Sequence, residues 1–232
     1  MHPGVEVSIC PLDRAAELAG RYEPLLSGDE RERAARFKLE RLRHAYVLGR
    51  GVTRAILGRR VGADPRALRF RYSTYGKPSL ESERELHFNV SHSGSLLACA
   101  VTPAGPVGVD VERVRPMRDA ANVARRFFST AEAERVLAAT AETRDAVFFE
   151  IWTRKEAFLK ATGAGFSRAL GSFSVSSGPG EIPRIERIND PDDDPALWSL
   201  RAFVPMESYI AALAVRAPIG EISIETVDPA TF

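Results

Sequence analysis

The chain has 232 residues, of which 44% are hydrophobic and 27% are charged, and its formal net charge is +1. This composition supports one large globular domain or two small ones, and it excludes a disordered acidic chain and a protein that binds polyanions through its overall charge. The cysteines, Cys10 and Cys99, have no CxxC or histidine-rich surroundings, and the longest apolar run is too short for a bilayer. We therefore expect a reducing cytoplasm, no zinc or disulfide scaffold, and no membrane insertion.

The N-terminal region is predicted to contain a strand at residues 5–10 and at least two helices between residues 11 and 60. Apolar residues recur there at helical spacing, and the long helix is expected to end at Gly58. Residues 31–60 are markedly basic, and two interpretations of this segment stay open. It is either a solvated helical face or an anion-binding wall that faces phosphate groups.

Residues 66–102 show the short apolar runs and turn residues that are typical of strands. We predict strands at 68–73, 86–90 and 96–102, with a GKP turn before the second of them. The segment SHSGS at 91–95 is predicted to be a polar loop between strands. Small polar residues of this kind form either an ordinary hairpin turn or a cradle for a phosphate or carboxylate.

The run VGVDVE at residues 107–112 alternates like a half-buried strand. If its valines face the core, Asp110 and Glu112 lie together on the opposite side, with their backbones about 7 Å apart. Two such carboxylates either form an exposed acidic edge or converge on one divalent cation. Oxygen ligands without His or Cys favour Mg²⁺ over zinc, and Mn²⁺ can substitute for it.

The most informative segment is WTRKEAFLKATG at residues 152–163, which is predicted to end a helix that begins near residue 143. Glu156 lies on the apolar stripe of this helix, and Lys160 follows one turn later on the same face. Only four of the 32 basic residues are lysines, and Lys155 and Lys160 are two of them. These charged residues are either solvated helix positions, or they serve a site that needs a compact point charge.

A capping box formed by Ser129 and Glu132 predicts the start of a short helix just before this long one. The end of the chain reads as strands with short turns between them. The predicted strands lie at 197–205, 208–217 and 221–227.

A faint internal duplication is present. The run SLLACAV at 95–101 resembles SYIAALAV at 208–215, after an interval of about 110 residues. We therefore predict an α+β (α/β) fold of two pseudo-twofold-related half-domains, residues 1–105 and 106–232. Each half is expected to be a small antiparallel sheet packed with a long helix, with the active site at their junction.

Four motifs resemble, in their order and spacing, those of the Sfp-type 4'-phosphopantetheinyl transferases: GKP at 76–78, FNVSHSG at 88–94, GVDVE at 108–112 and WTRKEAFLKATG at 152–163. The resemblance implies an enzyme that transfers the 4'-phosphopantetheine arm of coenzyme A to a serine of an apo-acyl or apo-peptidyl carrier protein. Adenosine 3',5'-bisphosphate would be released. It also implies that coenzyme A, the co-substrate, lies between the two halves with Mg²⁺ at its pyrophosphate.

The resemblance implies a role for each matching residue. Asp110, Glu112 and Glu156 match the metal positions, and we predict that Glu156 is also the general base that takes the serine proton. Lys160 matches the lysine that approaches the pyrophosphate, where it can stabilise developing charge. The residues that match coenzyme A contacts are Arg43, Arg50, Gly76, Lys77, Pro78, Ser91, His92 and Lys160.

The N-terminal arginines are the least specific of these matches. Ala45 occupies a position that is arginine in the best-known members of the family. Arg43 and Arg50 are therefore alternative candidates for the contact with the 3'-phosphate.

Two other functions agree with parts of the sequence. Another Mg²⁺-dependent transferase that acts on a nucleotide pyrophosphate would use the same acids and phosphate-binding residues. A nucleic-acid-binding module would use the basic segment 31–60, but it would leave the three acids and the rare lysines unexplained, so we expect no nucleic-acid partner. The carrier protein is expected to contact residues 126–137, and two halves in one chain favour a monomer.

Overall fold

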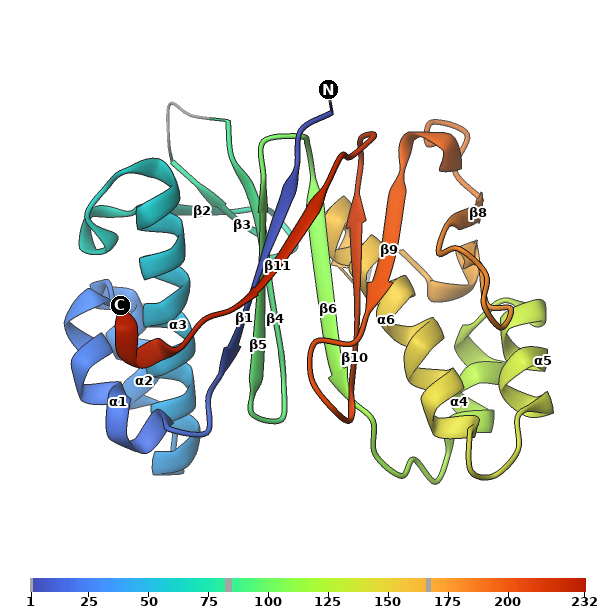
Figure 1. The fold of residues 1–232 in the computed structure, drawn as a ribbon, viewed down its shortest axis with the longest axis horizontal. Coiled ribbons are helices and arrows are strands. Elements are labelled where there is room, and N and C mark those ends of the chain that lie inside the picture. Colours follow the sequence, from blue (N-terminus) through green and yellow to red (C-terminus); the bar gives the residue numbers. More distant parts are fainter. Residues whose placement is uncertain (1, 82–84, 166–167) are drawn as a thin grey trace.

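The computed structural model describes residues 2–81, 85–165 and 168–232, and its elements form four layers, helices, sheet, sheet and helices (Figure 1). The first elements along the chain are β1 (Val5–Pro11), α1 (Ala15–Tyr22), α2 (Gly28–Ala35), α3 (Glu40–Val61), β2 (Phe70–Tyr72), β3 (Pro78–Leu80), β4 (His87–Ser93) and β5 (Leu96–Thr102). They are followed by β6 (Val107–Arg113), α4 (Ala120–Phe127), α5 (Thr130–Ala138), α6 (Arg144–Thr162), β7 (Phe173–Val175), β8 (Ile185–Ile188), β9 (Ser199–Phe203), β10 (Tyr209–Val215) and β11 (Ile222–Thr226).

The two halves of the chain repeat one topology. In the first half, β1 precedes helices that end with α3, then the ribbon β2–β3, then β4 and β5, and the strands pair in the order β1-β5-β4. In the second half, β6, α6, the ribbon β7–β8, β9 and β10 follow in the same way and pair in the order β6-β10-β9. The strands with the similar sequences, β5 and β10, are the middle strands of the matching units. The predicted duplication and the α+β fold of two similar halves are therefore confirmed.

The last strand departs from this repeat. β11 pairs in parallel with β1, with Val5 opposite Ile222, and so extends the sheet of the first half (red strand in Figure 1). The predicted boundary between residues 105 and 106 falls in the turn between β5 and β6. Residues 222–226 lie in the predicted second half but complete the first sheet.

Three apolar clusters hold the layers together. One lies between α1, α3 and the first sheet, one lies between the two sheets, and one lies between the second sheet and α6. Every residue of β5 is buried, because Leu97 and Cys99 face the first helical layer while Ala98 and Ala100 face the second sheet. Burying a side chain of the size of Leu97 contributes about 1.5–3 kcal/mol, and the cluster between the sheets holds the two halves in one unit.

The helix signals near the middle of the chain are confirmed. α6 begins after Thr143 and ends at Gly163, whose φ of 70° is the left-handed conformation that glycine adopts easily at a helix C-terminus. The capping box of α5 forms as predicted, with Ser129 and Glu132 hydrogen-bonded to each other's backbone N–H groups. No helix in the described part of the chain is long and apolar enough to cross a membrane.

The long N-terminal helix does not end at Gly58, as predicted. α3 continues to Val61 and is capped by Gly62, which has a φ of 70°. A Cβ at position 58 would lie 2.8 Å from the carbonyl oxygen of Ala63. Gly58 is therefore needed because the following turn packs closely over the helix, and its presence does not mark the helix end.

The predicted polar loop at 91–95 is also wrong in part. β4 continues through Ser91 and His92 to Ser93, and only Gly94 and Ser95 form the turn. The polar side chains of β4 are compatible with a strand because they bond to β6 across the junction of the halves.

Candidate active site

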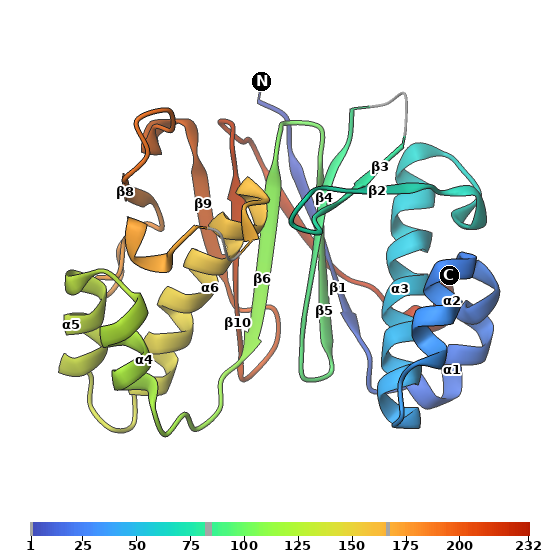
Figure 2. The same ribbon diagram turned by 180° about the vertical axis from the view of Figure 1, so that it is seen from behind.

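β6 brings the two predicted carboxylates to the junction of the halves. Its valines belong to the cluster between the sheets, while Asp110 and Glu112 leave the opposite face, against which α6 packs (Figure 2). The helix approaches so closely because residue 108 is glycine, and a Cβ there would lie 2.1 Å from the carbonyl oxygen of Ala157. The predicted alternation is confirmed, and the alternative of an exposed acidic edge is wrong for Asp110, which is 4% exposed.

Lys160 of α6 connects Asp110 of β6 with Ser91 of β4. The Lys160 ammonium donates to Asp110 Oδ1 at 2.6 Å and to Ser91 Oγ at 2.8 Å, and Ser91 Oγ donates to Asp110 Oδ1 at 3.0 Å. Burial raises the pKa of Asp110, while the nearby Lys160 ammonium lowers it. The second carboxylate oxygen, Asp110 Oδ2, is buried and has no hydrogen-bond partner among the described residues.

Glu112 is held in a similar way. Ser93 Oγ donates to Glu112 Oε2 at 2.6 Å, and Arg115 Nη1 approaches the same oxygen at 3.3 Å. The Arg115 guanidinium also lies over the ring of Phe149, 5.0 Å from its centroid. Arg115 therefore connects the end of β6 with the first turns of α6.

Glu156 lies on α6, one turn before Lys160. Its pKa is raised to about 7, first because the carboxyl is largely buried and then because Asp110 and Glu112 repel its charge, whereas Lys160 opposes the shift. The sequence had placed this carboxyl on an apolar stripe, and the half-buried position agrees with that prediction. A carboxyl with such a pKa can accept and release a proton near neutral pH.

The raised pKa makes a prediction about stability. In the unfolded chain Glu156 has an ordinary pKa of 4.5, so between pH 4.5 and 7 the folded protein holds a proton that the unfolded chain has released. The contribution of Glu156 to the stability of the wild-type protein therefore falls as the pH rises through this window. Glu156→Gln, which carries no charge, should be more stable than wild type by about 1–2 kcal/mol at pH 8, and the difference should vanish at pH 4. Urea unfolding at both pH values, without divalent cations, measures it.

The same variant also has a clear failing outcome. A Glu156→Gln protein that is less stable than wild type at pH 8 would show that the ionised carboxyl makes favourable contacts. Glu134→Gln, at an exposed position of α5, is the control. Its free energy of unfolding should be close to that of wild type at both pH values.

Besides burial, the nearby carboxylates of Asp110 and Glu112 raise the pKa of Glu156, and Glu112 adds to the raised pKa of Asp110. Among the described residues, however, no three Asp, Glu, His or Cys side chains stand in an arrangement that could hold a metal ion. The Lys160 ammonium contacts Asp110 directly and supplies positive charge at this position. The unpartnered Asp110 Oδ2 and the repulsion felt by Glu156 are nevertheless features that a bound divalent cation would relieve.

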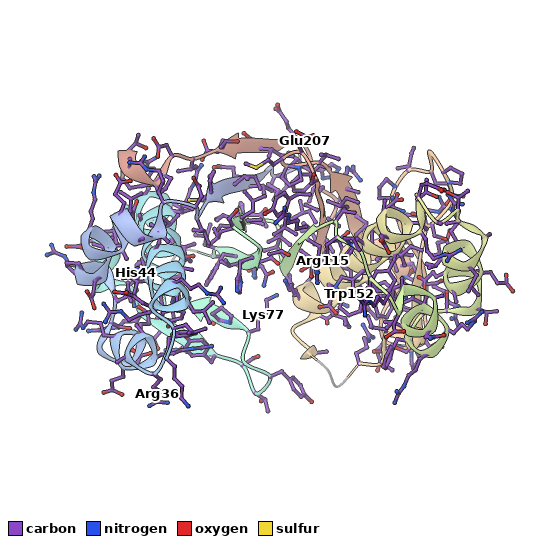
Figure 3. All side chains as sticks on the ribbon, turned by 90° about the horizontal axis from the view of Figure 1, so that it is seen from below. Arg36, His44, Lys77, Arg115, Trp152 and Glu207 are labelled. Carbon is purple, nitrogen blue, oxygen red and sulfur yellow. The ribbon has the colours of Figure 1, made fainter. Side chains whose placement is uncertain are left out.

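Lys77 reaches the same region from the first half. The turn before β3 needs a positive φ at Gly76, 81°, and Pro78 begins the strand. From this turn the Lys77 ammonium crosses to the second half and donates to the carbonyl oxygens of Val107, at 3.0 Å, and Ala161, at 2.7 Å (Figure 3). Burial lowers its pKa to about 8.

A cavity of about 270 Å³ lies beside this turn. It is lined by residues that include Tyr72, Lys77, Pro78, His87 and Phe88. Its floor comes from β4 and its wall from the β2–β3 ribbon. The GKP turn thus forms one edge of this cavity.

Ser91 and His92 are neighbours in a strand, so their side chains leave opposite sides of β4. Ser91 is buried against β6, whereas the His92 side chain is exposed. The pKa of His92 is lowered, mainly because the protein displaces part of the water around the ring and also because Lys160 lies nearby.

The two candidate arginines on α3 differ in their surroundings. Arg50 is bonded to Glu30 and to Tyr72 Oη, at 3.0 Å for the latter, and it stacks on the ring of Phe70. Arg43 has a buried Nε without a hydrogen-bond partner in the described part of the chain. Arg54, one turn after Arg50, is fully buried and shares Glu30 with it, so part of the basic segment is neither a solvated face nor an anion-binding wall.

The sequence did not point to Ser93, Arg115 or Gly108 as individual site residues. The signal for Ser93 was present in the alternation of Asn89, Ser91 and Ser93, three polar side chains spaced by two residues. It was missed because the last two were assigned to a loop. Arg115 follows the strand and gives no signal of its own.

Comparisons with known proteins agree with this geometry. Residues 17–104 match a family described as "4'-phosphopantetheinyl transferase, N-terminal", and residues 106–214 match the "4'-phosphopantetheinyl transferase superfamily". The chain is 38% identical to the 4'-phosphopantetheinyl transferase HetI of Nostoc sp. over 88% of its own length and 84% of HetI. It is 35% identical to the 4'-phosphopantetheinyl transferase Sfp of Bacillus subtilis over 67% of its own length and 68% of Sfp. The two matched regions follow the two structural repeats, and the chain thus belongs to the Sfp-type 4'-phosphopantetheinyl transferases.

Proposed function

We propose that this enzyme takes the 4'-phosphopantetheine arm from coenzyme A, transfers it to a serine of an apo-acyl or apo-peptidyl carrier protein, and releases adenosine 3',5'-bisphosphate. The observation that carries the proposal is the group formed by Asp110, Glu156 and Lys160 at the junction of the halves. It places an ammonium, a buried carboxylate and a carboxyl with a pKa of about 7 within one another's electrostatic reach. Phosphoryl-type transfer needs positive charge beside the leaving oxygens and a base beside the attacking hydroxyl.

We propose that Mg²⁺ is the metal of this site and that Mn²⁺ can replace it. Asp110, Glu112 and Glu156 would hold it after their carboxylates move closer together than they stand here, and the unpartnered buried oxygen of Asp110 supports this assignment. The carboxylate oxygens are the ligand type that Mg²⁺ prefers. When bound, the cation supplies electrostatic stabilisation of the negative charge on the pyrophosphate oxygens.

The side chains around this centre have distinct roles in the proposal. Lys160 stabilises charge on the pyrophosphate oxygens, and Glu156 takes the proton from the carrier serine. Residues of the first half hold coenzyme A. The turn of Gly76, Lys77 and Pro78 lies near the adenine nucleotide, Ser91 and His92 contact phosphate, and Arg43 and Arg50 are the candidates for the 3'-phosphate.

We propose Arg43 rather than Arg50 for the 3'-phosphate. Arg50 is already paired with Glu30, whereas a buried Nε of Arg43 has no hydrogen-bond partner in the described residues. Arginine binds phosphate through several directed N–H groups, and a guanidinium that is not already paired with a carboxylate is the better donor.

We propose residues 126–137 as part of the carrier contact. Phe127 is 43% exposed at the end of α4, and Arg126 packs over its ring. An exposed aromatic side chain next to a cation suits an acidic partner with an apolar contact. We also propose a cytoplasmic monomer, and the two buried cysteines, both free, support a reducing compartment.

The test uses purified protein, coenzyme A, Mg²⁺ and apo-carrier proteins, with mass spectrometry of the carrier. Addition of one phosphopantetheine arm to the carrier serine is expected, and no addition is expected after chelation of the metal. Transfer from another nucleotide pyrophosphate, with none from coenzyme A, would favour a different Mg²⁺-dependent transferase. A carrier whose serine is replaced by alanine is the control and should gain no mass.

Lys160→Ala is expected to lower kcat at least tenfold, with a smaller change in the affinity for coenzyme A. The ammonium contacts Asp110 and Ser91 at distances of 2.6 and 2.8 Å, at the place where charge develops on the pyrophosphate during transfer. Single-turnover rates and equilibrium binding of coenzyme A separate the two effects. A loss of affinity with an unchanged kcat would contradict this role, and Lys160→Arg tests whether a larger cation can replace the compact ammonium.

A further inference from the structure

The contact between β4 and β6 has an unusual chemistry. The two strands lie next to each other where the two sheets meet, but they belong to different sheets and share no backbone ladder. The N–H groups of alternate β6 residues instead donate hydrogen bonds to side-chain oxygens of β4. The pairs are Val109 N–H with Asn89 Oδ1 at 3.0 Å, Val111 N–H with Ser91 Oγ at 3.3 Å, and Arg113 N–H with Ser93 Oγ at 3.2 Å.

This column of side chains satisfies donors that would otherwise have no partner. The other edge of β6 pairs with β10, so the donors that face β4 are outside that ladder. Asn89 and Ser91 are 6% and 4% exposed, so these two members of the column are screened from water, whereas the bond from the Arg113 N–H to Ser93 is exposed. Buried backbone N–H groups are nearly always paired, because leaving one unpaired is strongly unfavourable.

The same hydroxyls also bind the acids of the site. Ser91 Oγ donates to Asp110 Oδ1, and Ser93 Oγ donates to Glu112 Oε2. Each serine therefore accepts from one β6 N–H and donates to the carboxylate of the preceding residue. The first pair, Asn89 with the Val109 N–H, has no carboxylate beside it. The residue before Val109 is Gly108, the glycine that allows α6 to approach.

Among the described residues, the hydrogen bonds given above for each carboxylate go to a single oxygen. Asp110 receives Ser91 and Lys160 on Oδ1, and Glu112 receives Ser93 and Arg115 on Oε2. Asp110 Oδ2 is buried without a partner in the described residues, and none of the bonds just named involves Glu112 Oε1. The column therefore fixes the two carboxylate groups while leaving one oxygen of each for another ligand.

We propose that Asn89 and Ser93 are positioning residues of this enzyme. Asn89 sets the alignment of β6 against β4, and Ser93 holds the Glu112 carboxylate by Oε2, which leaves Oε1 for the metal that Glu112 would help to hold. The inference rests on the proposed function for the role of Glu112, whereas the alignment of the strands is independent of it. Hydrogen bonds that orient ligating carboxylates typically change metal affinity or activity about tenfold or more when they are removed.

The first test measures amide hydrogen exchange of residues 107–113 in the metal-free protein. Ser93→Ala should accelerate exchange of the Arg113 N–H about tenfold, and Asn89→Ala should do the same for Val109. Ser93→Thr keeps the hydroxyl and should restore protection. Ser8→Ala is the matched control, because Ser8 also donates to a carboxylate, that of Glu225, but between β1 and β11.

The second test titrates Mg²⁺ alone into each protein by calorimetry and then measures the Mg²⁺ dependence of transfer. Ser93→Ala should weaken Mg²⁺ binding about tenfold and raise the Mg²⁺ concentration for half-maximal turnover by a similar factor. Ser93→Thr should bind as wild type does, and Ser8→Ala should leave both values unchanged.

The outcomes separate the inference from the function on which it rests. If amide hydrogen exchange in β6 were unchanged in Ser93→Ala and Asn89→Ala, the claim that the column aligns the strands would be wrong. Faster exchange with unchanged Mg²⁺ binding and turnover would overturn the positioning role of Ser93. Failure of the wild-type protein to transfer phosphopantetheine would refute the proposed function, while the exchange result would still decide whether the column aligns the strands.

Discussion

Glu156→Gln should lower kcat about 100-fold or more at saturating Mg²⁺, because removal of a general base typically has an effect of this size. Glutamine has nearly the same shape as glutamate but cannot accept the serine proton. The Glu156 carboxyl has a pKa of about 7 and lies beside the Asp110 and Lys160 group. The change in kcat is obtained from the rate at which the modified carrier protein forms. Mass spectrometry measures this rate at several Mg²⁺ concentrations.

Two comparisons make this prediction specific. Glu150→Gln replaces another carboxylate on the same helix. That carboxylate pairs with Arg154 outside the site, so the kcat of this variant should stay near that of wild type. If Glu156→Gln lost only affinity for Mg²⁺, excess metal would restore its rate, and the carboxyl would be a ligand rather than the base. Turnover close to the wild-type value at saturating Mg²⁺ would remove the assignment altogether.

Local signals in the sequence predicted much of the fold. The alternation of valine and acid in β6, the capping box of Ser129, and the glycine that ends α6 each depend on interactions within a few residues. Such interactions are visible in a single chain, and all three are present. The internal repeat was also detectable, because the middle strands of the two units carry similar apolar runs.

Most of the errors concern contacts between distant segments. Ser91 and Ser93 looked like loop residues because polar side chains are uncommon in a strand at a buried junction, but here β6 supplies the donors and acceptors that they need. Gly58 looked like a helix end, although it makes room for the turn that follows α3. The parallel pairing of β11 with β1 joins opposite ends of the chain, and no local pattern encodes it.

The site shows the same division. The acids and Lys160 could be selected from motif and spacing, but their hydrogen bonds could not. Lys77 was expected beside a nucleotide, and the structure shows that its ammonium also ties the two halves through backbone carbonyls. The scarcity of lysine was a useful signal, since Lys77, Lys155 and Lys160 all place a compact ammonium among several oxygen atoms.

Lys155 is the residue whose role the sequence left most open. The alternative of a solvated helix edge is wrong, because its side chain is fully buried between α6, α5 and β7. The ammonium donates to both carboxylate oxygens of Glu132 and to the carbonyl oxygen of Phe173, each at 2.8 Å. Glu132 in turn accepts the N–H groups of Ser129 and Val175, so one carboxylate joins the helix cap to the neighbouring strand.

Lys155→Met should therefore destabilise the protein by about 3–5 kcal/mol, the usual effect of removing one partner from a buried ion pair. Methionine fills a similar volume, so the loss comes mainly from the Glu132 carboxylate that stays buried without its counterion. Burial lowers the pKa of Lys155 to about 8, which leaves the ammonium charged at pH 7. Urea unfolding at pH 7, followed by circular dichroism, measures the change in the free energy of unfolding.

The double variant Lys155→Met, Glu132→Gln tests the physical reason. Glutamine retains an oxygen for the helix cap but carries no charge, so the double variant should recover more than half of the lost stability. Lys38→Met is the control at an exposed lysine, and it should leave the free energy of unfolding nearly unchanged. Equal destabilisation by Lys155→Met and Lys38→Met would mean that burial of the charge pair is not what stabilises the second half.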